Sequence, residues 1–91
     1  SIISFLKPGI IKVYSKSEEN KYFVEDGIVE FKDNSLSILT SSIYNVSDLD
    51  RNKIEQILKD AEKESTEENI EDQKKYLINQ KIETLRSLQS N

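Results

Sequence analysis

The sequence predicts an α+β fold in which a β-rich part is followed by a helical part. In residues 1–46 the apolar side chains come in short runs separated by turn signals, as is typical of short strands. In residues 47–91 they recur at helical spacing, with charges between them and no Gly or Pro. We therefore predict two domains, 1–46 and 47–91, which meet at Val46 and Ser47.

The composition of the 91-residue chain excludes several kinds of site. It has no Cys and no His, so it can form no disulfide or thiolate metal site, and it lacks the commonest metal ligand and general base. The net charge of −4 comes from 13 basic and 17 acidic residues, without the excess of Lys and Arg that nucleic-acid binding needs. We expect no catalytic residue, no metal, no cofactor and no nucleic-acid partner.

The first predicted hairpin follows a turn at Pro8 and Gly9. Proline suits the first central position of a type II turn, and glycine accepts the positive φ of the second. Residues 10–14 and 21–25 are rich in β-branched and aromatic side chains, and we predict that they pair as antiparallel strands. Between them, residues 15–20 form a polar run that we interpret as the hairpin loop.

A second hairpin is predicted after Gly27, which we expect to supply a positive φ or a bulge. Residues 28–32 and 35–40 are the strands, and Asp33 with Asn34 is a two-residue turn signal. The pattern thus predicts four short antiparallel strands, with their apolar side chains in a core. Such strands normally pack one face against a second sheet, which makes a β-sandwich. The chain contains no Met, and we expect this sandwich to be incomplete at its N-terminal side.

The first predicted helix spans about residues 48–64. Ser47 followed by Asp50 has the form of a capping box, so Ser47 is the expected cap. Glu55 and Lys59 form an i, i+4 pair in the favourable order. The apolar stripe of this helix consists of Ile54, Ile57, Leu58 and Ala61.

The second predicted helix spans about residues 66–89 and begins at the polar pair Ser65 and Thr66. Its stripe consists of Ile70, Leu77, Ile78, Ile82, Leu85 and Leu88. The two helices can form an antiparallel hairpin, or they can join into one extended helix of about 60 Å. The polar pair costs only a fraction of a kcal/mol in helix propensity, so we predict that the two arrangements lie close in energy.

The order of these motifs resembles the epsilon subunit of F-type ATP synthases, called delta in mitochondria. The resemblance rests on the apolar and Lys-Pro-Gly run at 5–13, the strand pair at 22–31, the alternating strand at 35–39 and the Asp-Leu-Asp of 48–50. It covers essentially the whole chain. One departure is Asp26, which stands where the family usually has the first of two glycines.

The resemblance implies a non-catalytic central-stalk subunit of a proton-translocating ATP synthase. The family fold is a β-sandwich followed by a two-helix domain, and its partners are the gamma subunit and the c ring. The helical domain folds as a hairpin on the sandwich or, in some bacteria, extends along gamma into the alpha/beta head and inhibits ATP hydrolysis. The implied location is peripheral, at the cytoplasmic face of a bacterial inner membrane or the matrix face in mitochondria, with membrane contact only through the complex.

Basic residues of the second helix contact an acidic loop of the beta subunit in inhibitory members of the family. Here the corresponding candidates are Lys74, Lys75, Lys81 and Arg86. The alternative is that they form a solvated helix end that matches the helix dipole.

Some bacterial members bind ATP through a Leu/Ile-Asp-x-x-Arg-Ala motif at the first helix. This chain keeps Leu49 and Asp50, but it has Lys53 in place of Arg and Ile54 in place of a small residue. We therefore expect Asp50 to cap the helix and ATP not to bind.

Two further expectations complete the sequence-based picture. An alternative function is a free-standing adaptor whose helical hairpin binds a coiled-coil partner. Because an incomplete sandwich exposes an apolar face and an open edge, we also expect self-association.

Overall fold

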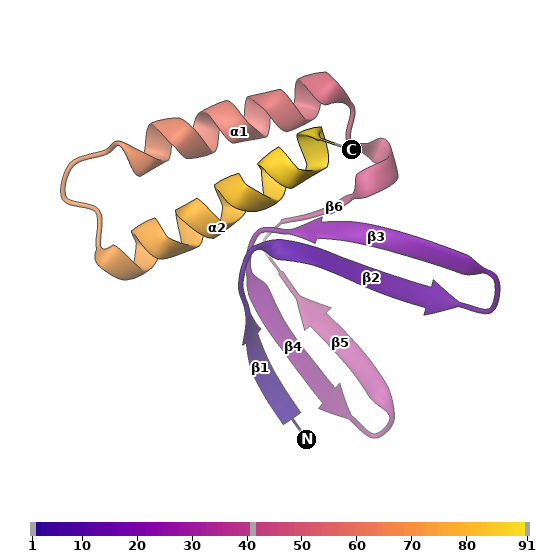
Figure 1. The fold of residues 1–91 in the computed structure, drawn as a ribbon. Helices are drawn as coiled ribbons and strands as arrows, with labels where there is room; N and C mark the ends of the chain where they lie inside the picture. The colour runs from indigo at the N-terminus through magenta and orange to yellow at the C-terminus, as the bar shows by residue number, and fades with distance from the viewer. Residues whose placement is uncertain (1, 41, 91) are drawn as a thin grey trace.

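The computed structural model describes residues 2–40 and 42–90, so Ser1, Ser41 and Asn91 of the predicted domains lie outside the described residues. Six strands precede two helices (Figure 1). The strands are β1 (Ile2–Leu6), β2 (Gly9–Ser15), β3 (Glu18–Val24), β4 (Gly27–Lys32), β5 (Ser35–Leu39) and β6 (Ile43–Asn45). A short 3₁₀ turn, η1 (Val46–Asp48), follows the strands. The two helices are α1 (Arg51–Ser65) and α2 (Asp72–Gln89).

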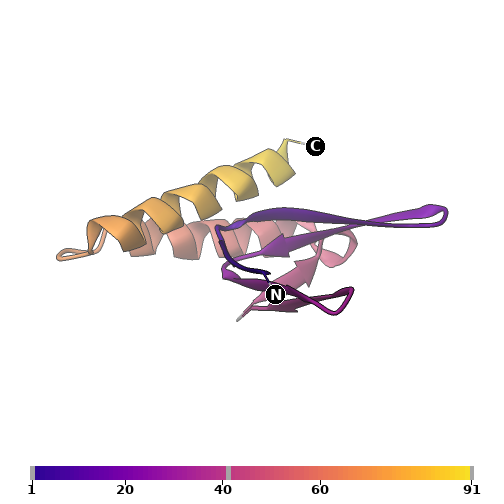
Figure 2. The ribbon, with the colours of Figure 1, turned by 90° about the horizontal axis from the view of Figure 1, so that it is seen from below.

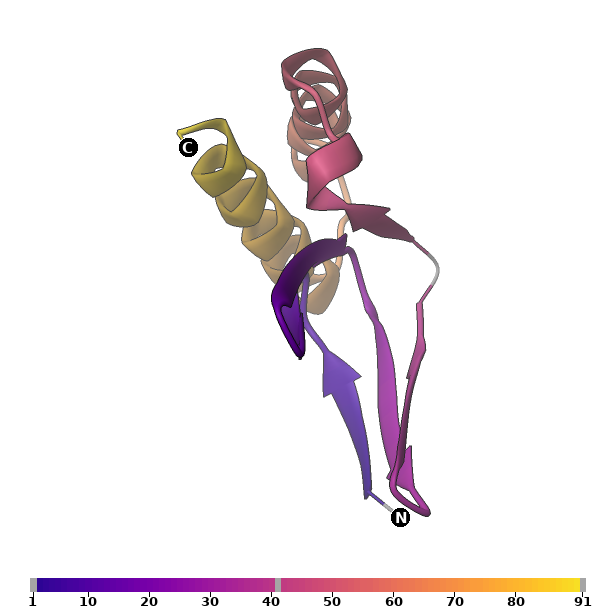
Figure 3. The same cartoon turned by 90° about the vertical axis from the view of Figure 1, so that its right-hand side faces the viewer.

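The strands form two antiparallel three-stranded sheets, with the orders β1-β4-β5 and β2-β3-β6. The helical hairpin packs on the β2-β3-β6 sheet, and the β1-β4-β5 sheet lies on the other side (Figures 1 and 3). The predicted α+β class is confirmed, but the prediction of four strands is wrong because β1 and β6 are also strands. Strand β6 has only three residues, which is too short to show an alternating pattern.

The hairpin of β4 and β5 confirms the predicted two-residue turn. Asp33 and Asn34 have φ values of 52° and 63°, and two consecutive positive φ angles define the turn type that suits the twist of a hairpin. Phe31 pairs with Leu36, yet these side chains are 44% and 63% exposed. The prediction that every apolar side chain of this half belongs to the core is therefore wrong, because the described core lies on the helix side of the other sheet.

The hairpin of β2 and β3 is longer than the sequence predicts. The pairing runs from Gly9 opposite Val24 to Ser15 opposite Glu18, so the turn has two residues. The predicted loop at 15–20 is wrong because the backbone hydrogen bonds of a ladder continue through polar residues as well as apolar ones. This hairpin extends beyond the helices (Figures 1 and 2).

The chain passes between the two sheets three times at one place, which we call the corner. The corner consists of Lys7 with Pro8, Glu25 with Asp26, and Thr40 with Ser42. It is braced by hydrogen bonds from the Thr40 hydroxyl to the Asp26 carbonyl and from the Glu25 N–H to the Ser42 carbonyl.

The two glycines beside the corner have different roles. Gly27 has the predicted positive φ, at 157°, and a Cβ there would lie 2.6 Å from the carbonyl oxygen of Leu39. The predicted type II turn at Pro8 and Gly9 is wrong. Gly9 has no positive φ and starts β2, because the chain crosses to the second sheet here and does not reverse.

Helix α1 is capped by Asp50, whose Oδ1 accepts a hydrogen bond of 2.7 Å from the Lys53 N–H. The prediction that Ser47 caps this helix is wrong. Ser47 lies in η1, where its N–H and its hydroxyl both donate to Oδ1 of Asn45. The short 3₁₀ turn delays the start of the α-helix from residue 48 to Arg51.

The connection between the helices spans residues 66–71. Asn69 has a φ of 63° there, in the left-handed region that interrupts a right-handed helix and that asparagine tolerates. Helix α2 therefore begins at Asp72 and not at residue 66 as predicted. The Ser65 hydroxyl donates to the Glu62 carbonyl within α1 and does not cap α2. The structure shows the hairpin arrangement (Figure 1).

The core joins the helical hairpin to the β2-β3-β6 sheet through Phe23. This side chain is 0% exposed, and its ring stacks on Tyr44 with 6.0 Å between the centroids. The helices surround it with buried residues of both predicted stripes: Ile54, Ile57, Leu58, Ala61, Ile78, Ile82 and Leu85. One aromatic ring of the β half is thus enclosed by apolar side chains of both helices.

Candidate functional site: the basic residues of helix α2

Of the four basic residues predicted to contact a partner, Lys81 is bound within the chain. Its Nζ lies 3.0 Å from Oε1 of Glu25, and both side chains are only 20% exposed. Glu25 belongs to the corner and Lys81 to α2, so this ion pair ties the helical hairpin to the sheets. A pair that is largely withdrawn from water is less screened by salt than a surface pair.

Arg86 is also paired, but within the helical hairpin. Its Nη2 lies 3.4 Å from Oε2 of Glu62 on α1, and both side chains are exposed. The predicted pair of Glu55 and Lys59 is present as well, at 3.6 Å. Exposed pairs of this kind contribute about 0–1 kcal/mol each, so neither pair determines where the hairpin lies.

Lys74 and Lys75 lie near the start of α2 with exposed side chains. Among the described residues neither of them takes part in an ion pair. Lys74 borders a shallow, largely acidic surface with Asp60, Lys63, Glu64 and Glu67. The structure therefore divides the four predicted contact residues into two with internal partners and two that are open to solvent.

A second contact between α2 and the corner was not predicted from the sequence. Lys7 donates a hydrogen bond of 3.1 Å from Nζ to the Tyr76 hydroxyl, and its Nζ lies 5.5 Å from the centroid of the same ring. The sequence does not identify Lys7 or Glu25 as a contact of α2. Each lies beside a predicted turn, where charged residues are common.

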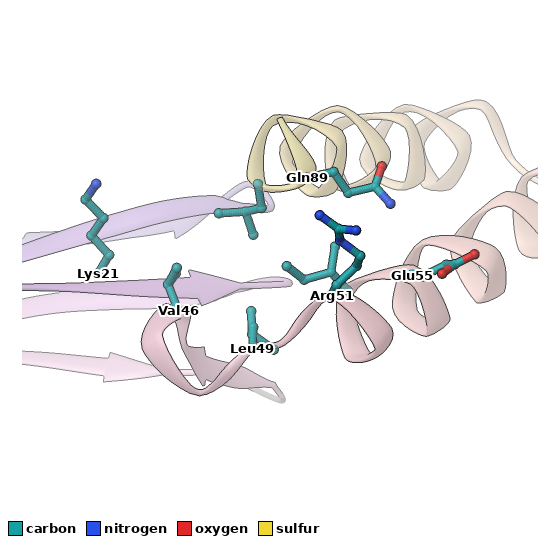
Figure 4. A pocket seen from close by; sticks show the side chains of 8 residues that line it. Lys21, Val46, Leu49, Arg51, Glu55 and Gln89 are labelled. Atoms are coloured by element: carbon teal, nitrogen blue, oxygen red, sulfur yellow. The ribbon is translucent and has the colours of Figure 1, made fainter. Parts of the chain in front are cut away.

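An open pocket of about 560 Å³ lies between the start of α1, the end of α2 and the second sheet (Figure 4). Its walls are formed by Lys21, Val46, Leu49, Arg51, Ile54, Glu55, Leu88 and Gln89. The Arg51 side chain points toward Gln89, while Lys21 lies farther away on the sheet (Figure 4).

The pocket contains only part of the expected ATP-motif remnant. Leu49 and Ile54 line it, but Asp50 and Lys53 are not among its lining residues. The Asp50 carboxylate is already occupied as the cap of α1. The remnant therefore does not assemble a carboxylate and a cation around one cavity.

The described residues contain neither a candidate metal site nor a candidate membrane-spanning helix. No group of three or more acidic side chains is arranged to hold a metal ion in residues 2–40 and 42–90. In the same part of the chain, no helix has the length and apolar character needed to cross a membrane.

Comparison with known proteins decides the family. The model of the beta-sandwich domain of the ATP synthase delta/epsilon chain matches residues 1–46. The chain is also 61% identical over 88 residues to an ATP synthase epsilon chain of Pelagibacter ubique (strain HTCC1062), covering 97% of this chain and 68% of that relative. The chain belongs to the ATP synthase epsilon family.

Two further comparisons extend this result. An epsilon chain of Hydrogenovibrio crunogenus (strain DSM 25203 / XCL-2) is 31% identical over 61 residues, which cover 67% of this chain and 42% of that relative. A chain in the cryo-EM structure of the Euglena gracilis mitochondrial ATP synthase, determined as OSCP/F1/c-ring in rotational state 1, matches with a TM-score of 0.61 and 20% identity. That match covers 98% of this chain and 56% of the other, and it shows that the two chains share a fold.

Proposed function

We propose that this epsilon chain is a non-catalytic subunit of the central stalk of a proton-translocating ATP synthase. In this role it connects the gamma subunit and the c ring to the catalytic head, at the cytoplasmic face of a bacterial inner membrane or the mitochondrial matrix face. The observation that carries the proposal is the 61% identity to an epsilon chain over 88 residues, because it includes both the strands and the helices. A chain without His or Cys also offers little for covalent or acid–base chemistry.

Co-purification with a gamma subunit tests this proposal. A tagged gamma subunit is expected to retain the chain at micromolar concentration through several washes. Failure to bind at that concentration would contradict the central-stalk assignment and would favour an adaptor that binds another coiled coil. A variant with Leu36→Lys on the exposed β1-β4-β5 sheet shows whether that sheet takes part in binding.

We further propose that the helical hairpin regulates the complex as an arm that leaves the sheet and contacts an acidic surface of the alpha/beta head. Lys74 and Lys75 support this role because their side chains are exposed and have no ion pair among the described residues. Removing residues 47–91 is expected to raise the ATP hydrolysis rate of the assembled complex. An unchanged rate, with the truncated chain still present in the complex, would refute the regulatory arm.

A further inference from the structure

The helical hairpin meets the rest of the chain through two kinds of contact. The first is the apolar core that Phe23 shares with buried residues of both helices, with Ile10 and Tyr44 packed against it. The second is polar and lies at the corner, where Lys81 pairs with Glu25 and Tyr76 contacts Lys7. Both polar contacts come from α2, so one helix carries the charged attachment of the whole hairpin.

Glu25 is well placed to act as a fixed acceptor. It directly follows β3, and its own N–H donates to the carbonyl of Ser42 at 3.2 Å. The carbonyl of the next residue, Asp26, accepts a hydrogen bond from the Thr40 hydroxyl, and Gly27 lies against the backbone of Leu39. Because three chain crossings hold this backbone, the Glu25 carboxylate is anchored to the sheets and not to the helical hairpin.

The Lys81 ammonium has to satisfy two competing roles. In the hairpin state it lies 3.0 Å from the Glu25 carboxylate, with 20% of its side chain exposed. If Lys81 contacts an acidic surface of another subunit, as the proposed arm requires, the ammonium has to leave Glu25, because the docked Lys81 side chain is largely buried against the corner and offers little surface to a second carboxylate. Lys74 and Lys75 take part in no ion pair among the described residues, so no such pair has to break before they contact a partner.

We propose that Glu25 is an internal substitute for an acidic partner and that the Lys81–Glu25 pair is a charge-controlled latch on the helical hairpin. An acidic protein segment first meets the exposed Lys74 and Lys75 and then replaces Glu25 as the counter-ion of Lys81, which releases α2 from the corner. This inference rests on the proposed regulatory arm and identifies the contact that keeps it docked.

The absence of Cys in the native chain allows a direct measurement of docking. Spin labels on Lys12→Cys of β2 and Asn79→Cys of α2, both exposed positions, report the distance between sheet and helix. Glu25→Gln, which keeps the side-chain shape and removes the charge, is expected to raise the ratio of undocked to docked chains about tenfold or more. Because the pair is largely withdrawn from water, raising the salt to about 1 M is expected to raise this ratio less than Glu25→Gln does, and to leave the Glu25→Gln variant unchanged.

Two controls separate the latch from a general loss of stability. Glu62→Gln removes the exposed acid that pairs with Arg86 and is expected to leave the sheet-to-helix distance unchanged. The reversed pair of Glu25→Lys with Lys81→Glu is expected to restore docking that Glu25→Lys alone disrupts. Equal distance distributions for Glu25→Gln, Glu62→Gln and the native chain would overturn the latch.

A deca-glutamate peptide serves as the probe for the acidic partner. At low salt it is expected to raise the undocked fraction of the native chain and to have no further effect on Lys81→Gln. An unchanged native distance at saturating peptide would overturn the exchange of counter-ions. These measurements use the isolated chain, so failure of the latch is distinguishable from failure of the proposed function, which shows in gamma binding and in the ATP hydrolysis rate.

Discussion

Replacing Phe23 with alanine tests whether the helical hairpin depends on one ring of the β half. Phe23 is 0% exposed, contacts the buried stripes of both helices and stacks on Tyr44. Losing its transfer free energy and leaving a cavity costs about 3–5 kcal/mol in cores of this kind, and the lost aromatic pair adds about 1 kcal/mol. A domain of this size has about 5–14 kcal/mol in total, so the loss is a large share of the free energy of unfolding.

The assay is urea unfolding followed by circular dichroism at 222 nm, where the two helices give most of the signal. Phe31→Ala is the matched control, because this ring lies on the other sheet and is 44% exposed. We expect Phe31→Ala to lower the free energy of unfolding by about 1 kcal/mol or less. If Phe23→Ala does not fold, Phe23→Leu keeps most of the apolar volume and is expected to cost about 1 kcal/mol. Equal losses for the Phe23 and Phe31 variants would refute the reasoning.

Four further predictions concern Gly27, the helix cap, the pocket and the exposed sheet. Gly27→Ala is expected to lower the melting temperature by more than about 8 °C, because its Cβ meets the Leu39 carbonyl, whereas Gly9→Ala has space and is expected to change it little. Asp50→Ala is expected to cost about 1 kcal/mol in urea unfolding, and Ser47→Ala less; the reverse order would contradict the assigned cap. Calorimetry is expected to show no millimolar or tighter ATP binding, and clear heats would contradict the interpretation of the pocket. Sedimentation is expected to show self-association that Leu36→Lys reduces, and a clean monomer of the native chain would refute it.

Local signals in the sequence predicted much of the fold correctly. The Asp33-Asn34 turn and the stripe of α1 are confirmed because they depend on backbone geometry and helical spacing within a few residues. The start of each helix was harder to predict. Ser47 and Asp50 both suit a cap, and the choice was decided by Asn45, which engages Ser47 in a 3₁₀ turn. Asn69 interrupts the helix through a positive φ, which asparagine adopts without the usual marks of glycine or proline.

The charged contacts of the site could not be predicted in the same way. The family resemblance made Lys81 a candidate for a partner contact, but its counter-ion Glu25 is 56 positions away in the chain. Such a pair depends on how α2 crosses the corner, and this is set by the packing of Phe23 between the helices. Periodicity reports which face of a helix is buried but gives no information on which distant charge lies at its edge.

The change from a docked hairpin to one extended helix consists of two steps: the hairpin first leaves the sheet, and its two helices then straighten into one. Undocking the intact hairpin loses the ion pair and the contacts of Phe23. Straightening it also requires Asn69 to leave its positive φ and exposes the seven buried residues that α1 and α2 contribute to the core. At about 1.5–3 kcal/mol for each large side chain, straightening costs on the order of 10 kcal/mol, a term that helix propensity alone does not include. Replacing Glu25 therefore weakens the docking of the hairpin without removing the apolar contact, and a partner must also cover the apolar stripes before a single long helix can form.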